Sequence, residues 1–512
     1  MSASAEGDGA AAAEDAAAER AGTATTAREG AAAAATTAHA DARRSGAATS
    51  SRYGRGVAVL SVGIGVTGLV TYAYFSLSSH ALSASDYGGI TLLWSAVFIT
   101  AAVLYRPIEQ MLSRTIADRE ARGQAGTRHL RVAATIQLAL GVAFAGAALA
   151  LRGPLEDELL GGSATLYWIL IVAVLAYAAS YFGRGFLAGH HRFGLYGGLV
   201  LMESVSRCLF ALAVVLGVAP EQAAAALGIA AGPIVSLAVV PWALGRRLRG
   251  GAEGGRAGTG AGREPSGAVV ADVPDEAGAA ALESTAAAEP RAEGGRAESE
   301  FTLAYGGGFA AAVLLVMLAE QTFLNAGPLV VKATEGTRGA ALAGFAFNVL
   351  LIARAPLQLF QAVQTSILPH LTRLRAGGDE DPFRRSVNVT IAAIAVFAVL
   401  VALVMLAIGP TLMDLFFGGD FGYPRLGLLL VSVGMGLYLA AATLNQAALA
   451  RGRAPAAAAC WAGSAAAFVA FLLAWRFNDR VLQVEIAFLA AAALLCALLG
   501  SLYRADGSRA ER

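Results

Sequence analysis

The sequence predicts an all-α integral membrane protein with twelve transmembrane helices, in two six-helix halves related by pseudo-twofold symmetry around a central cavity. Three observations lead to this fold class. Of the 512 residues, 56% are apolar and only 15% are charged, whereas about 25% are charged in a typical soluble protein. Apolar runs long enough to cross a hydrocarbon core of about 30 Å recur along the chain. The third observation is a weak internal repeat.

Each predicted helix is an apolar run of about 20 residues or more, bounded by polar or glycine-rich sequence. The first six spans cover residues 57–79, 89–112, 130–151, 164–186, 195–217 and 222–245. The second six cover residues 303–331, 340–368, 387–409, 425–450, 455–475 and 483–503.

The segments between and around these runs define the domain organisation. Residues 1–55 and 246–300 are rich in Ala, Gly, Glu and Arg and poor in large apolar side chains. Such composition cannot bury enough surface to offset chain entropy, so both segments are expected to be disordered. The expected organisation is therefore an N-terminal tail, a first half (56–245), a linker, a second half (301–503) and a short tail (504–512).

Arginine placement predicts the orientation of the chain. With the N-terminus inside, the loops on the cytoplasmic side hold fourteen basic residues, Arg106 and Arg184 among them, and the opposite loops hold six, including Arg480. Short cytoplasmic loops carry an excess of basic residues. We therefore expect a multi-pass protein of the cell membrane whose two termini, linker and tails are cytoplasmic.

Composition also excludes several classes of function. The net charge of +1 gives no basic field for nucleic acid, and the three cysteines lie apart within apolar runs. The acidic cluster Asp379–Asp381 is expected in a solvated loop, and His190 and His191 at a membrane interface. No nucleotide-binding Gly-x-x-x-x-Gly-Lys motif is present. We expect no cofactor, no metal and no enzymatic activity.

The internal repeat aligns the second span with the eighth. Pro107 and Pro356 are 249 residues apart and could kink both helices at matching positions; static kinks are the alternative. At this offset further positions align, namely Tyr74 with Phe323, Asp86 with Glu335 and Phe98 with Phe347.

Ionisable side chains within spans are costly, by at least about 2.5 kcal/mol each, and so indicate partners or a cavity. Glu203 and Arg207 lie four residues apart on the fifth span, a spacing at which they can pair. The pair could be structural, or it could line a cavity and loosen when an anionic ligand competes for Arg207.

The seventh and eighth spans carry further polar groups. Arg354, Gln358, Gln361 and Gln364 lie on one helical stripe. Glu320, with Gln321 and Asn325, lies on the seventh span and is the expected partner of Arg354. Such a stripe must face protein or water, as an interhelical seam or as the wall of a cavity. Arg106 could alternatively extend its side chain to the headgroups.

Several motifs resemble those of one known family. They are Leu82–Gly89 (LSASDYGG), Tyr181–Gly189 (YFGRGFLAG) with Arg192 and Phe193, the Glu203/Arg207 pair, and Leu415–Phe421 (LFFGGDF). In this order, within twelve spans, they resemble the polysaccharide (O-antigen type) flippases of the multidrug/oligosaccharidyl-lipid/polysaccharide exporter superfamily. The resemblance covers about residues 57–503, and the long N-terminal tail and the linker depart from the commonest pattern of the family.

The resemblance implies alternating access that moves a polyprenyl-diphosphate-linked glycan outward. It further implies that Arg106, Arg207 and Arg354 hold the diphosphate, with Glu203, Glu320, Gln358 and Gln361 beside them. Expected partners are the lipid-linked glycan, membrane lipid and enzymes of glycan synthesis. Two alternatives stay open, an ion-coupled multidrug exporter of the same superfamily and a non-transporting scaffold. A membrane glycosyltransferase is disfavoured because the outside loops are short.

Overall fold

In a computed structural model of the chain, the structure describes residues 63, 65–122, 124, 126–219, 221–238, 303–352, 354, 380–418 and 422–510. All of them lie in one compact unit, Leu60–Arg512, which contains both predicted halves. The predicted tail (1–55) and linker (246–300) lie outside the described residues, and the domain boundaries stay a prediction.

The described part of the chain is helical throughout, with turns and bends but no strand. The first half comprises a helix over 65–81, α2 (Ala84–Ala121), α3 (Arg128–Ala150), the short π-helix η1 (Pro154–Leu159), α4 (Ala164–Gly189), α5 (Phe193–Val215) and α6 (Gln222–Ser236). The second comprises α9 (Leu303–Glu335), the 3-10 turn η2 (Gly336–Arg338), a helix Gly339–Ile352, α11 (Glu380–Phe417), α12 (Arg425–Ala450), α13 (Ala454–Ala474) and α14 (Arg480–Ala510).

Each of the twelve predicted spans coincides wholly or in part with one of these helices. Nine of the described helices are long and apolar enough to cross a membrane, and two shorter ones are apolar. The main differences are at the ends: α2 covers Ala84–Ala121 where residues 89–112 were predicted, and α14 continues to Ala510, through most of the predicted tail 504–512.

Local chemistry explains the early start of α2. Ser83 is the N-cap of α2, and its hydroxyl accepts a hydrogen bond from the backbone N–H of Asp86, which satisfies an otherwise unpaired donor. Glu380 and Asp381 are helical, and the described part of α11 begins at Glu380. The expectation of a solvated loop is therefore wrong for these two acidic residues, although Asp381 is exposed.

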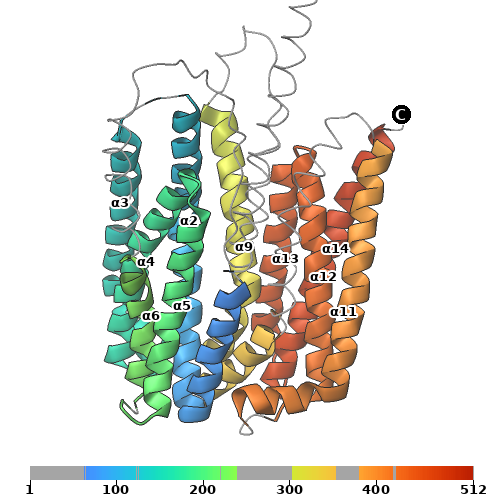
Figure 1. The fold of residues 1–512 in the computed structure, drawn as a ribbon. Coiled ribbons are helices and arrows are strands. Elements are labelled where there is room, and N and C mark those ends of the chain that lie inside the picture. Colours follow the sequence, from blue (N-terminus) through green and yellow to red (C-terminus); the bar gives the residue numbers. More distant parts are fainter. Residues whose placement is uncertain are drawn as a thin grey trace, which may run out of the picture. The chain divides into compact units, whose positions relative to one another are not determined.

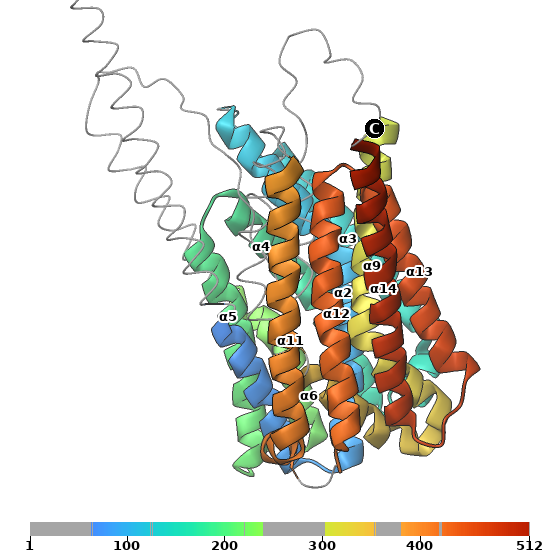
Figure 2. The same cartoon turned by 90° about the vertical axis from the view of Figure 1, so that its right-hand side faces the viewer.

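The same helix pairs contact each other in both halves. In the first half α3 packs on α4, α4 on α6 and α5 on α6; in the second, α11 packs on α12, α12 on α14 and α13 on α14. Figure 1 shows α2–α6 grouped together, and Figure 2 shows α11, α12 and α14 side by side. This correspondence supports the internal repeat at the level of architecture. Pro356 lies outside the described residues, while Pro107 lies inside α2.

The two halves share one apolar core. α9 packs on both α13 and α2, and the buried rings of Phe75 and Phe347 lie 4.7 Å apart across the halves. Next to the start of α2, Gly88 lies so close to the helix Gly339–Ile352 that an added Cβ would be 1.8 Å from the carbonyl oxygen of Ala340. The halves therefore touch backbone to backbone at this end.

A buried hydrogen-bonded chain reinforces that contact. The Tyr87 hydroxyl donates to Oδ1 of Asn348, and Nδ2 of Asn348 donates to the Tyr423 hydroxyl at 3.0 Å. All three side chains are buried, and buried polar groups of this kind are costly to leave unpaired. The chain joins α2 of the first half to two segments of the second.

Candidate functional site

α4 and α5 bring together a buried ion pair that sequence reasoning did not predict. Glycines let α4 approach α2 closely, since a Cβ on Gly185 would lie 2.7 Å from the carbonyl oxygen of Glu109. One residue earlier, Nη2 of Arg184 lies 2.6 Å from Oε2 of Glu203, with both side chains almost fully buried. Ser180 also donates to Glu203. Glu203 is thus held between helices rather than along its own.

The predicted Glu203–Arg207 pair is wrong for this structure. Nη1 of Arg207 donates to the Tyr177 hydroxyl at 3.1 Å, and Nη2 donates to the Ser204 hydroxyl at 2.9 Å. The guanidinium carbon lies 4.7 Å from the centroid of the Trp94 ring. The i,i+4 spacing makes a contact available, but here Glu203 pairs with Arg184 on α4, and Arg207 bonds Tyr177 of α4 and Ser204 of its own helix.

Arg207 therefore keeps its positive charge in a buried position without a carboxylate beside it among the described residues. Hydroxyl groups and the ring faces of Trp94 and Phe98 solvate the guanidinium, and a desolvated cation–π contact contributes about 2 kcal/mol. Neutral partners of this kind leave the charge uncompensated. Such a guanidinium is suited to an anionic group, which it can engage through two parallel hydrogen bonds.

A second charged group lies between the halves. Arg106 of α2 and Glu320 of α9 are both buried, and they interact electrostatically. Oε1 of Glu320 accepts a hydrogen bond from the Tyr438 hydroxyl at 3.2 Å. Burial of Arg106 excludes the alternative in which its side chain extends to the headgroups. Glu320 is the partner of Arg106 and Tyr438, and not, as the sequence suggested, of Arg354.

Arg354 lies near the same group. Its charge and that of Arg106 both act on Tyr438, and its guanidinium carbon lies 5.9 Å from the centroid of the Phe347 ring. Gln358, Gln361 and Gln364 of the predicted stripe lie outside the described residues. The structure thus brings Arg106, Arg354 and Glu320 into one neighbourhood.

Arg207 does not belong to that neighbourhood. It contacts Trp94 and Phe98 of α2, which precede Arg106 by 12 and 8 residues. At helical rise this separation is about 12 to 18 Å along α2. The three arginines predicted to share one ligand therefore form two groups, one within the first half and one between the halves.

Sequence reasoning missed Arg184, Tyr177 and Tyr438. Arg184 was assigned to a cytoplasmic loop, as was Arg106, and Arg480 to an outside loop, but all three are buried, and Arg480 pairs with Glu335 at 2.5 Å. When these three arginines are left out of the loop counts, the cytoplasmic side still holds the excess of basic residues. The one signal that could have found Arg184 is its place among the closely spaced glycines of the Tyr181–Gly189 motif.

Two other predicted features have local structural roles. The ring of His190 contacts the carbonyl oxygen of Phe186 at 2.8 Å where α4 ends, and His191 adopts a positive φ of 54° in the turn to α5. Among the described residues no group of His, Cys, Asp and Glu side chains is arranged to hold a metal ion.

Comparison with known proteins identifies the fold. No family model matches the chain, and no curated protein is significantly similar in sequence. Among solved structures, an inward-facing multidrug resistance MATE family transporter of the MOP superfamily gives a TM-score of 0.62 at 12% identity, covering 88% of this chain and 98% of that one. An outward-facing structure with the same description gives 0.51 at 12% identity, covering 88% and 96%.

A mutant of the Vibrio cholerae MATE transporter VcmN gives a TM-score of 0.52 at 16% identity, covering 89% of this chain and 97% of that one. Identities this low show the fold alone. The more specific resemblance to polysaccharide flippases stays a prediction. Taken with the two matching sets of helix contacts, these similarities show that the chain has the all-helical, two-half fold of MATE transporters.

Proposed function

We propose that this protein is a membrane transporter that works by alternating access. The observation that carries the proposal is the pairing of two six-helix halves with the same internal contacts in a fold shared with transporters. The solved structures with that fold are described as inward-facing and outward-facing. Two halves that rock against each other would expose a site between them to each side of the membrane in turn.

The contacts at the start of α2 are the ones that such a motion would open. The Tyr87–Asn348 hydrogen bond and the Gly88 backbone contact both join the two halves. The Arg106–Glu320 interaction does so further along α2. Apolar packing of α9 on α2 accompanies these polar contacts, and an equilibrium between two packings needs differences of only a few kcal/mol.

For the substrate, the comparisons favour the multidrug alternative over the glycan. The structural neighbours are described as multidrug resistance transporters, so ion-coupled export of drug-like molecules is the first candidate. Glu203 and Glu320 are buried carboxylates between helices and are the groups we assign to the coupling ion in this reading.

A second candidate, transport of a lipid-linked glycan, rests on one observation. Arg207 is buried and has only neutral partners among the described residues, which favours an anionic ligand such as the diphosphate of a polyprenyl-linked sugar. In this reading Arg207 holds the diphosphate, while Arg106 and Arg354 attract it at the contact between the halves. The resemblance also assigns Gln358 and Gln361 to this ligand, and both lie outside the described residues.

Transport by reconstituted vesicles separates these readings. We would measure efflux of a cationic dye driven by an imposed ion gradient, and translocation of a fluorescent polyprenyl-diphosphate sugar, with wild type and with Arg207→Gln. The matched control is Arg122→Gln, because Arg122 is exposed and, among the described residues, pairs with exposed Asp118. Dye efflux that survives Arg207→Gln supports the multidrug reading.

Loss of glycan translocation of about tenfold or more in Arg207→Gln supports the anionic substrate, because one charge-assisted hydrogen-bonded contact is worth roughly 1.5 to 3 kcal/mol. Arg207→Lys should also be impaired, since an ammonium group cannot form the two parallel hydrogen bonds of a guanidinium. Wild-type vesicles that move neither substrate would contradict the transport proposal and favour a scaffold.

A further inference from the structure

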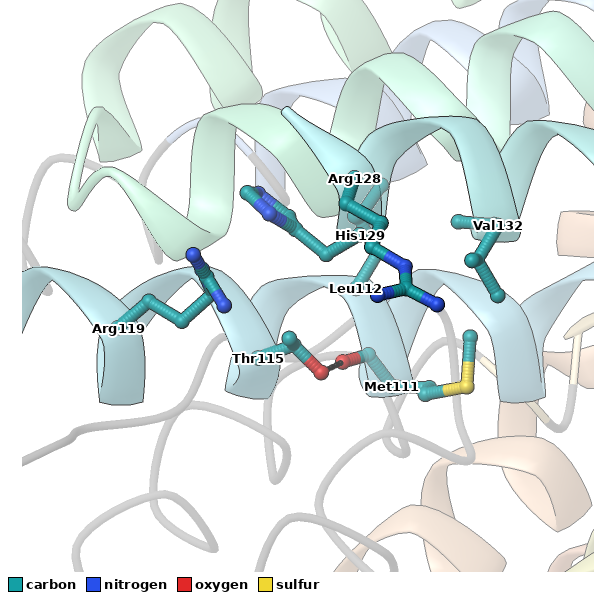
Figure 3. A pocket seen from close by; sticks show the side chains of 8 residues that line it. Met111, Leu112, Thr115, Arg119, Arg128, His129 and Val132 are labelled. Atoms are coloured by element: carbon teal, nitrogen blue, oxygen red, sulfur yellow. Dashed lines mark hydrogen bonds between the residues drawn. The ribbon is translucent and has the colours of Figure 1, made fainter. Parts of the chain in front are cut away.

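Outside the two charged groups, the structure contains a pocket of about 280 Å³ between the end of α2 and the start of α3. Figure 3 shows side chains from both helices meeting there, with the guanidinium of Arg119 extending from α2 and that of Arg128 from α3. The lining residues are Met111, Leu112, Thr115, Arg119, Arg128, His129, Val132 and Ala133.

The polar lining of this pocket consists of Thr115 and three basic side chains. Arg119, Arg128 and His129 line it, and no carboxylate does. Neither of the two acids that flank Arg119 in the sequence lines the pocket, and one of them, Asp118, pairs with Arg122 at 3.0 Å. Arg128 forms no ion pair with an acid in the described parts of α2 and α3. Basic side chains from both helices thus line the same pocket.

The rest of the pocket is apolar and open to the surroundings. Met111 is 42% exposed and Val132 is 49% exposed, and each lies within the lining together with buried Leu112 and Ala133. A site for a free anion does not need exposed apolar side chains beside its basic groups. An amphipathic ligand uses both parts.

The position of the pocket along α2 fits such a ligand. α2 has 38 residues and is therefore about 57 Å long, whereas the hydrocarbon core is about 30 Å thick. The apolar run of α2 ends near residue 112, so the turns after it project beyond the hydrocarbon, and α3 re-enters from the same end at Arg128. The basic side chains consequently lie at the level of lipid headgroups, with Met111 and Val132 one or two turns closer to the acyl chains.

We propose that this pocket binds an anionic phospholipid, whose headgroup phosphate is held by Arg119 and Arg128 and whose acyl chain lies over Met111 and Val132. Guanidinium groups hold phosphate oxygens through charge-assisted hydrogen bonds, and basic pockets between transmembrane helices bind anionic headgroups. The assignment is independent of the transported substrate, since no residue of the pocket belongs to either charged group described above.

Lipid binding to the purified full-length protein in detergent tests the proposal. The probes are short-chain phosphatidylglycerol, short-chain phosphatidylcholine and sn-glycerol phosphate, with affinity measured by titration and bound lipid counted by native mass spectrometry. Phosphatidylglycerol is expected to bind most tightly, with an affinity that falls as salt is raised. Arg119→Gln/Arg128→Gln should weaken it about thirtyfold, while the exposed-arginine control Arg122→Gln should not change it.

The other probes distinguish the lipid from a free phosphate. If sn-glycerol phosphate binds as tightly as phosphatidylglycerol, the ligand is a soluble phosphate and the lipid assignment is wrong. If phosphatidylcholine binds as tightly as phosphatidylglycerol, or if the double variant binds phosphatidylglycerol as tightly as wild type, the basic pocket is not the binding site. Met111→Ser, which keeps every charge, should weaken the lipid but not sn-glycerol phosphate, so the proposal stays testable if the double variant fails to fold.

Discussion

Neutralising one member of the Arg184–Glu203 pair should destabilise the protein more than neutralising both. The two groups lie 2.6 Å apart, with 5% and 1% of their side chains exposed. Breaking a buried pair costs about 3 to 5 kcal/mol, because a buried charge loses its partner. For Arg184→Met the loss of stability should lie near the lower end of this range, since the hydroxyls of Ser180 and Ser236 still donate to Glu203.

The double variant Arg184→Met/Glu203→Gln removes both charges of the pair and should recover at least about 1 kcal/mol relative to Arg184→Met alone. The assay is reversible unfolding in mixed micelles, followed by tryptophan fluorescence. The exposed pair Arg122–Asp118, at 3.0 Å and with 66% and 53% of its side chains exposed, provides the control. There, Arg122→Met and Asp118→Asn should each change stability by about 0.5 kcal/mol or less.

If the two single losses simply add in the Arg184/Glu203 double variant, the two side chains are not energetically coupled. The short N···O contact would then contribute nothing to stability, and the pairing of Glu203 with Arg184 would have no energetic consequence. A coupling equal to that of the exposed pair would refute the reasoning equally, because burial is the only physical difference between the two pairs that the prediction uses.

Two further predictions concern packing and topology. Gly185→Ala should lower stability by about 1 to 3 kcal/mol, because its Cβ would be 2.7 Å from a carbonyl oxygen of α2. The control Gly198→Ala, whose Cβ would have no atom within 4 Å, should be neutral or slightly stabilising. Thermal unfolding compares the two variants, and equal effects would contradict the close packing of α4 on α2. Reporter fusions at Arg122 and Glu156, at opposite ends of α3, should read as cytoplasmic and outside respectively; the reverse result would overturn the arginine-based orientation.

The positions of the helices are determined by the sequence itself. A bilayer offers no hydrogen-bond partners to the backbone, so each crossing must be a continuous apolar helix of about 20 residues. The run 425–450 matches α12 at both ends, and residues 455–475 match α13 to within one residue. The early start of α2 also follows from the local sequence, because Ser83 caps the helix and Asp86 lies in its first turn.

The partners of the charged side chains are decided only by the tertiary structure. Glu203 has Arg207 one turn away, yet it pairs with Arg184 on another helix, while Arg207 turns to Tyr177 and the Trp94 ring. Spacing along one helix says which groups can meet, but not which direction each side chain faces once helices pack. Glu320 shows the same rule across the halves, where α2 supplies Arg106 and α12 supplies Tyr438. In an apolar interior a polar group must be satisfied by whatever packing places beside it, and packing is a property of the whole fold.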